Sequence, residues 1–259
     1  MGAWKKFAAT LELKLAIRLA DVDATTATTK IASALSAGIF TSNSDNATMT
    51  YDQSSPGNSN PLWQALVNSG RHDFVPANLL VSKMVGWSDP RLSLYFTQYN
   101  GGYSGGTPGK AKGYGLFSDF SAAIQKASYP GIILSYWQAE FWQAEAAARS
   151  IASSGSAQSH YNNAITASIE YWSGSAGAAV TYLAQPSVAY TTAIGSWQQI
   201  LGYPNIDVVS PPLRTQGNLP LRLAYPSTES GSNATNWAAA VAALPGGQDV
   251  VSAKLFWMK

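Results

Sequence analysis

The chain has 259 residues, a length that permits one large domain or two small ones and a substantial buried core. Charged residues form 12% of it, about half of the roughly 25% expected of an ordinary soluble domain. The net charge of +2 and the lack of basic runs among the aromatics argue against a nucleic-acid partner, and the lack of cysteine excludes disulfides and thiolate chemistry.

The first forty residues predict two helices. Residues 4–20, "WKKFAATLELKLAIRLA", and residues 26–38, rich in Ala and Ser, are typical of helices, and Gly38 is placed to end the second. Apolar residues recur at four-residue steps in the first helix and give it a broad apolar face: Phe7, Leu11, Leu15 and Leu19. No apolar run approaches the length that crosses a bilayer, so we expect any export signal to lie outside this sequence.

A long loop is predicted next. Residues 41–62 are dense in Asn, Asp, Ser, Pro and Gly, which favour turns, while Met49, Tyr51 and Trp63 indicate a loop that packs. The stretch "NSDN" within it lacks the glycine and the distal glutamate of a calcium loop, which argues against metal binding. A short helix is predicted after the loop, at residues 74–84.

A glycine-rich stretch, residues 97–121, has no helical period and lacks the spacing of a phosphate-binding loop. It carries Tyr99, Tyr103 and Tyr114, and functional residues are often found on loops that a rigid scaffold positions. The preceding "SDPRL", residues 88–92, predicts a turn that a hydrogen bond of its Asp or Arg side chain clamps.

A helical hairpin is predicted at residues 135–149 and 160–172, about the size of a tetratricopeptide unit of about 34 residues. Its first helix has a stripe with core spacing: Trp137, Phe141, Ala144 and Ala148. Glu140 and Glu145 diverge by about 140° around the helix, so they cannot work together as an acid and a base without another segment. Glu145 is expected to pair with Arg149, and the helix to support a site formed elsewhere.

The aromatic content indicates the class of ligand. Nine Trp and 13 Tyr in a charge-poor chain suit a neutral polyhydroxylated ligand, because rings stack on its C–H faces and polar side chains bind its hydroxyl groups. Any single ring is more often part of the core. Loop composition selects as glycan-binding candidates Trp63, Trp87, Tyr99, Tyr103 and Tyr114. We expect no cofactor, no metal site and no catalytic residue.

Several segments, taken in order, resemble the carboxy-terminal part of SusD/RagB-like proteins. They are "WKKFAATLELKLAIRL", "SNSDNA", "SDPRL", "EFWQAEAAAR", "YNNAITASIEYW", "LPLRLAYPSTESGSN" and "KLFWMK". The resemblance implies a mainly α fold of tetratricopeptide-like helix pairs with long irregular loops, and no catalysis. It also implies a lipoprotein at the cell surface of Bacteroidetes, in the outer membrane, that binds an oligosaccharide or polysaccharide and passes it to a TonB-dependent, SusC-like transporter.

The resemblance assigns structural positions to Asp89, Pro90 and Arg91 in a turn, and to Ala144 and Glu145 in the scaffold helix. It assigns further loop positions late in the chain: Pro220, Arg222, Tyr225, Pro226, Glu229 and Asn233.

Family members begin with a signal peptide, a lipid-bearing cysteine and a long helical region, none of which this sequence contains. We therefore expect residues 1–259 to form a single, shortened SusD-like domain without its lipid anchor. On this reading Trp142 packs against the missing helical region.

Two other functions stay open. A scaffold protein could use its exposed aromatics to dock a protein partner, because aromatic residues are enriched in protein interfaces too. A glycoside hydrolase is the third possibility, because two carboxylates from distant segments could flank a sugar. Binding of oligosaccharides, capture of a membrane-protein partner and release of reducing ends would distinguish the three.

Overall fold

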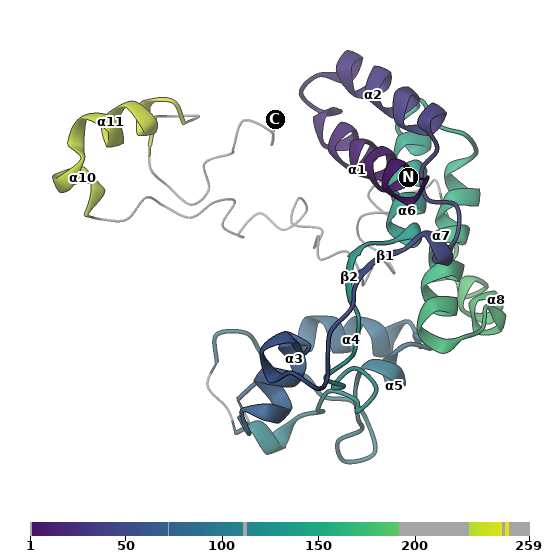
Figure 1. Cartoon of the computed structure of the whole chain (residues 1–259), viewed down its shortest axis with the longest axis vertical. Coiled ribbons are helices and arrows are strands. Elements are labelled where there is room, and N and C mark those ends of the chain that lie inside the picture. Colours follow the sequence, from purple (N-terminus) through teal and green to yellow (C-terminus); the bar gives the residue numbers. More distant parts are fainter. Residues whose placement is uncertain (1, 72, 111–112, 192–227, 245–246, 249–259) are drawn as a thin grey trace.

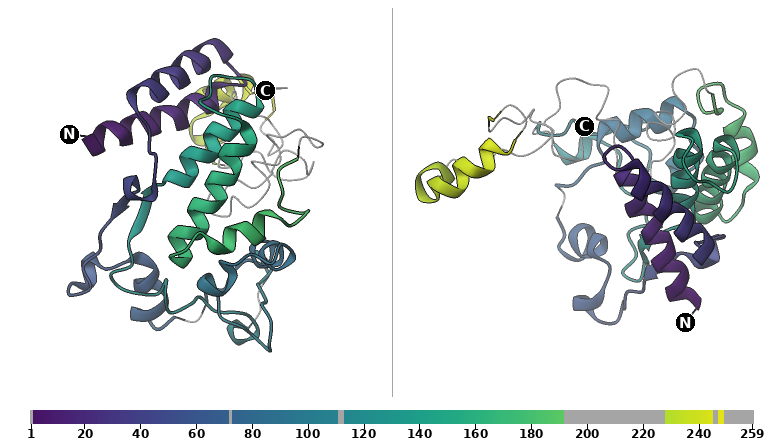
Figure 2. Two further views of the ribbon diagram at one scale, coloured as in Figure 1. Left: turned by 90° about the vertical axis from the view of Figure 1, so that its right-hand side faces the viewer. Right: turned by 90° about the horizontal axis from the view of Figure 1, so that it is seen from above.

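The computed structural model is mainly α-helical and contains two helix pairs (Figures 1 and 2), which confirms the predicted fold class. In the first pair, α1 (Gly2–Leu19) packs on α2 (Ala24–Ala37), and in the second, α6 (Tyr136–Ala148) packs on α7 (Ala157–Ser173). α1 also contacts α6, and α8 (Gly177–Leu183) packs on α7. The structure describes residues 2–71, 73–110, 113–191, 228–244 and 247–248.

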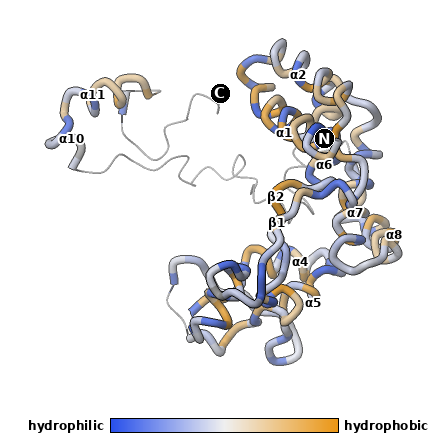
Figure 3. The backbone as a smooth tube through the Cα atoms, viewed as in Figure 1, coloured by the Kyte–Doolittle hydropathy of each residue, from blue (hydrophilic) through white to orange (hydrophobic). Residues whose placement is uncertain are grey.

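A lobe, formed by residues 50–130, is inserted between the two helix pairs. The chain enters it through β1 (Ala47–Met49) and leaves it through β2 (Gly131–Leu134), which pair antiparallel with Thr48 opposite Ile132. Figure 1 shows these two strands as a neck between the helices and the lobe, and Figure 3 shows that β2 is strongly apolar. Neither strand was predicted from the sequence, because segments this short show no alternating pattern.

The lobe consists of short elements joined by loops. They are η2 (Pro56–Asn58), α3 (Pro61–Trp63), η3 (Gln64–Asn68), α4 (Asn78–Gly86), α5 (Leu92–Tyr95) and η4 (Tyr114–Leu116), and η1 (Asn43–Asp45) precedes the neck. α4 begins four residues later than the helix predicted at 74–84. Pro76 contributes to the delay, since a proline disfavours helical backbone at the residue before it, here Val75. Ala77, the last residue before α4, is extended, with ψ of 134°.

Side-chain caps set the ends of the long helices. Ser135 and Gln138 form a capping box at the start of α6, in which each side chain bonds the backbone N–H of the other residue. Ser156 caps α7 by accepting from the N–H of Ser159, and Gly174 ends that helix in the left-handed conformation, with φ of 75°. These signals are local, which is why the predicted hairpin lies within a few residues of the observed one.

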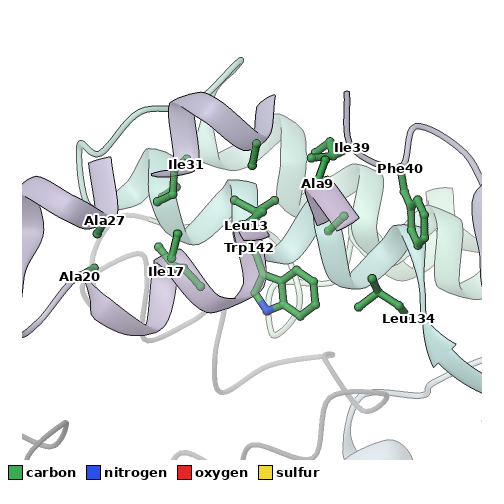
Figure 4. Packing of buried hydrophobic residues seen from close by; sticks show 14 residues of the cluster. Ala9, Leu13, Ile17, Ala20, Ala27, Ile31, Ile39, Phe40, Leu134 and Trp142 are labelled. Atoms are coloured by element: carbon green, nitrogen blue, oxygen red, sulfur yellow. The ribbon is translucent and has the colours of Figure 1, made fainter. Parts of the chain in front are cut away.

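A hydrophobic core joins the two helix pairs (Figure 4). It comes from α1, α2, α6 and their adjoining segments, and its larger buried members are Leu13, Ile17, Ile31, Phe40, Leu134 and Trp142. Only part of the apolar face predicted for α1 is buried. Leu13 and Ile17 are buried, whereas Leu15 and Leu19, two members of the four-residue series, are 59% and 41% exposed.

α6 is buried on nearly all sides because it lies between α1 and α7. Trp137 and Phe141 are buried as predicted. The expectation for Trp142 was wrong, since this ring is 4% exposed inside the core shared by α1, α2 and α6 and needs no further segment to cover it. A helix packed between two neighbours has little surface in contact with solvent. Its sequence therefore lacks the amphipathic pattern from which the burial of each residue could be predicted.

A buried ion pair attaches the lobe to the second helix pair. Arg91 donates to both carboxylate oxygens of Asp89, at 2.9 and 2.6 Å, and neither side chain is exposed. Arg91 also donates to Ser168 Oγ of α7 at 2.7 Å, and Tyr182 of α8 donates its hydroxyl to Asp89 at 2.9 Å. The predicted clamp in "SDPRL" is confirmed, and it holds two helices as well as its own turn.

Near the carboxy terminus, α10 (Glu229–Ser232) and α11 (Ala234–Ala242) contact each other. The motif residues Pro220, Arg222, Tyr225 and Pro226, together with "KLFWMK", lie outside the described residues.

Candidate functional site

The aromatic residues selected from the sequence occupy three environments. Trp87 is 9% exposed and packs in the core of α6, α7 and α8, which leaves little of its ring for a ligand. Tyr103 is half-buried against the core of the lobe. Trp63, Tyr99 and Tyr114 are half-buried at the lobe surface, on α3 and in the glycine-rich stretch.

The glycine-rich stretch is ordered by backbone pairing. Tyr99 and Gly102 exchange N–H to carbonyl bonds of 2.8 and 3.1 Å, which closes a tight turn whose central Asn100 and Gly101 both have positive φ. Such a turn favours Asn-Gly for that reason. It presents Tyr99 at the base of the turn.

Close packing fixes the middle of the stretch against the start of α4. A side-chain carbon on Gly105 would lie 2.6 Å from the backbone N and Cα of Asn78, and one on Gly106 would lie 2.7 Å from a methyl group of Val75. The N–H of Gly106 donates to the carbonyl of Pro76 at 2.8 Å. Only residues without a side chain permit this approach, so the glycines position one wall of a groove.

The first groove, named the Tyr114 groove, is a cavity of about 460 Å³ between the segment before α4 and the glycine-rich stretch. Its aromatic lining comes from Phe74, Tyr114 and Phe117, and its polar lining includes Asp73, Thr107 and Lys110. Tyr114 was selected from the sequence, and Phe117 was recognised there only as one of several loop aromatics. Phe74 was missed, because it was taken for the first residue of a helix.

Hydrogen bonding fixes the Tyr114 ring. Its hydroxyl donates to Asp119 Oδ2 at 2.6 Å. This hydrogen bond, burial and the charge of the carboxylate together raise the pKa of Tyr114 to about 12. The phenol is neutral at physiological pH, and its hydrogen bond to Asp119 fixes the position of the ring.

The second groove, named the Tyr51 groove, is a cavity of about 500 Å³ in the loop between β1 and α3. It is lined by Met49, Tyr51, Asp52, Asn58, Pro61 and Gln64, among others. The Tyr51 ring packs against Gly131 of β2, in the neck. A Cβ atom added at Gly131 would lie only 3.1 Å from the Tyr51 side chain. Met49 and Tyr51, both predicted from the sequence to pack, line this groove, and Met49 is 50% exposed there.

The carboxylates of both grooves are already engaged by the protein. Asp52 accepts from the backbone N–H and the hydroxyl of Ser54, at 2.9 and 2.7 Å. Asp73 pairs with Arg71, whose guanidinium also lies 5.0 Å from the centre of the Phe74 ring. The grooves therefore offer apolar rings, hydroxyls and amides beside carboxylates that already accept hydrogen bonds from the protein.

The two glutamates of α6 have structural roles. Glu140 accepts from Gln143 at 3.3 Å and lies 2.7 Å from His160 Nδ1, while Glu145 pairs with Arg149 at 3.0 Å as predicted. Burial raises the pKa of Glu145, although Arg149 acts in the opposite direction. Both side chains are buried between helices and lie outside the two grooves.

Neither a metal-ligand cluster nor a membrane-spanning helix occurs in the described parts of the chain. There, no three His, Asp or Glu side chains are grouped so that they could hold a metal ion. Every helix in those parts is too short or too polar to cross a bilayer.

The sequence matches a known protein family. Residues 1–205 match the model of the SusD-like family described as starch-binding and associating with the outer membrane. No curated protein matches the sequence.

Solved structures of similar proteins cover nearly the whole chain. A chitin-binding protein is 25% identical with a TM-score of 0.71, and the match covers 99% of this chain and 64% of that one. A chitin-binding SusD homologue from Flavobacterium johnsoniae (24% identity, TM-score 0.75) and a SusD homologue from Bacteroides uniformis (24%, 0.78) are matched over 100% of this chain and over 64% and 65% of their own. This chain thus spans less than two thirds of the length of these relatives.

Proposed function

This chain belongs to the SusD-like family of starch-binding proteins associated with the outer membrane, and we propose that it binds glycans without cleaving them. The observation that carries the proposal is the pair of grooves on the lobe. Each of the two loops selected from the sequence for its aromatics, residues 41–63 and 95–120, lines one of them.

Both grooves have the chemistry that a sugar requires. Rings such as Tyr114 and Phe117 offer flat apolar faces to sugar C–H groups, and Asn58 and Thr107 offer an amide and a hydroxyl to sugar hydroxyls. Because half-exposed contacts each contribute little, a single site would bind weakly. Chitin and starch are the first ligands to test, since relatives are described as binding them.

The finer function follows from the family and is part of the same proposal. We propose that the protein acts at the cell surface, held to the outer membrane by a lipid anchor, and delivers glycan to a TonB-dependent, SusC-like transporter. We also propose that the chain forms one domain, because the Asp89–Arg91 clamp and the neck tie the lobe to the helices.

The decisive experiment is thermal unfolding and calorimetry with malto- and chito-oligosaccharides. A sugar that binds only the native state raises the melting temperature. Tyr114→Ala and Phe117→Ala, both in the Tyr114 groove, are expected to weaken binding by about fivefold to tenfold, which corresponds to about 1 kcal/mol per ring. Trp4→Ala is the matched control, because Trp4 is 77% exposed on α1 and lies outside the lobe. A folded protein that binds no sugar would overturn the proposal.

A second function is supported by one surface. On α1, the side chains of Trp4, Leu15 and Leu19 are 77%, 59% and 41% exposed on the face opposite Leu13. Apolar surface of this kind is typical of protein contacts, which favours an interaction module as the alternative. Capture of a transporter by a protein that ignores sugars, and its loss in Trp4→Ala, would support that alternative.

A further inference from the structure

The two grooves flank one short helical segment, and we infer that they hold a single linear glycan that passes across it. The inference rests on the proposed function and specifies its ligand as a long chain bound along its length. Pro61 and Gln64 line the Tyr51 groove at one side of the segment, and Asp73 and Phe74 line the Tyr114 groove after its other end.

The segment between the grooves has an unusual backbone. η3 is a π-helical turn in which the N–H of Ser69 donates to the carbonyl of Gln64 at 3.0 Å, five residues earlier. A single π turn is rare and is frequently found at functional sites. Leu62 lies on α3 just before this turn, and Val67 lies within it.

Exposed apolar residues occur in both grooves and on the segment between them. Met49 of the Tyr51 groove and Phe74 of the Tyr114 groove are 50% and 42% exposed. Leu62 of α3 and Val67 of η3, between them in the chain, are 44% and 46% exposed. We name Leu62 and Val67 the ridge.

Neither the separation of the two grooves nor the carboxylates that line them excludes a single ligand. Gln64 lines one groove and Asp73 the other, so the connecting chain limits their separation to at most about 30 Å, a span that an oligosaccharide can cover. Asp52 accepts hydrogen bonds from Ser54 and Asp73 pairs with Arg71, so each of these carboxylates already has a partner within the protein. A polymer that occupies both grooves gains affinity because the second contact is intramolecular.

Calorimetry of the full chain with a disaccharide and a hexasaccharide of the same sugar tests the inference. We expect the hexasaccharide to bind with one molecule per protein and on the order of 100-fold more tightly than the disaccharide, which should fill two sites. Phe74→Ala and Met49→Ala should each weaken hexasaccharide binding by about fivefold and weaken one of the two disaccharide sites by the same factor.

A variant in the ridge distinguishes one ligand that spans both grooves from two ligands that bind independently. Val67→Ser should weaken hexasaccharide binding about threefold and leave disaccharide binding unchanged, and Val180→Ser, at a 73% exposed valine of α8, should change neither. Two hexasaccharides per protein, or hexasaccharide binding sensitive to one groove alone, would overturn the inference while leaving glycan binding intact. No binding of either sugar by the folded protein would overturn both.

Discussion

The guanidinium of Arg91 lies 2.7 Å from the hydroxyl of Ser168, a residue 77 positions later in the chain. Arg91 belongs to the lobe and Ser168 to α7, and Asp89 neutralises the buried charge between them. A charge removed from water must be compensated, so the lobe is fixed in one position relative to the helices as long as all partners are present.

Arg91→Met should destabilise the protein by about 3–5 kcal/mol, because it leaves the Asp89 carboxylate buried without its cation. Urea unfolding measures the loss. The matched control is Arg71→Met at the half-exposed pair with Asp73, which should cost less than about 1 kcal/mol. Equal effects of the two changes would show that the buried clamp contributes no more than a surface pair.

Gly105→Ala should destabilise the lobe by about 1–3 kcal/mol, since the added carbon would lie 2.6 Å from the backbone of Asn78. Gly102→Ala is the control, because nothing lies within 4 Å of the corresponding position. Its effect should stay within about 0.5 kcal/mol. Thermal melts compare the two, and a harmless Gly105→Ala would contradict the close approach that forms the groove wall.

Thr10→Val should cost about 1–3 kcal/mol although the side chain barely changes size. Thr10 is fully buried and its hydroxyl oxygen accepts the N–H of Phe40 at 2.9 Å, so valine leaves a buried donor unpaired. Thr28→Val, on the exposed side of α2, leaves no buried N–H without an acceptor. It should change the free energy of unfolding by less than about 0.5 kcal/mol. Chemical denaturation of both variants provides the comparison.

Glu145→Gln should change how stability depends on pH. Burial raises the pKa of Glu145 above its ordinary value of 4.5, so the folded state binds this proton more tightly than the unfolded state. The resulting stability is present below pH 4.5 and is lost as the pH rises through the raised pKa. The free energy of unfolding of wild type relative to Glu145→Gln should therefore fall over that range, and a difference that is constant with pH would contradict the prediction.

Much of the helical frame could be predicted because its signals are local. Helical spacing, the Ser135 cap and the glycine after α7 lie within a few residues of the boundaries that they set. The Glu145–Arg149 pair and the turn at Asp89 are also contacts between near neighbours in sequence. Membership of the family followed from the order of such segments.

The depth of each aromatic residue was decided by the tertiary structure alone. Trp87 and Trp142 have sequence surroundings like those of exposed rings, yet both are buried by helices distant in the chain. Tyr51 and Phe74 line grooves that exist because the neck and the glycine-rich stretch approach them from residues 131 and 106. The sequence by itself thus determined which segments are helices and which loops carry rings, and only long-range packing decided which rings remain available to a ligand, because burial depends on segments that meet after folding.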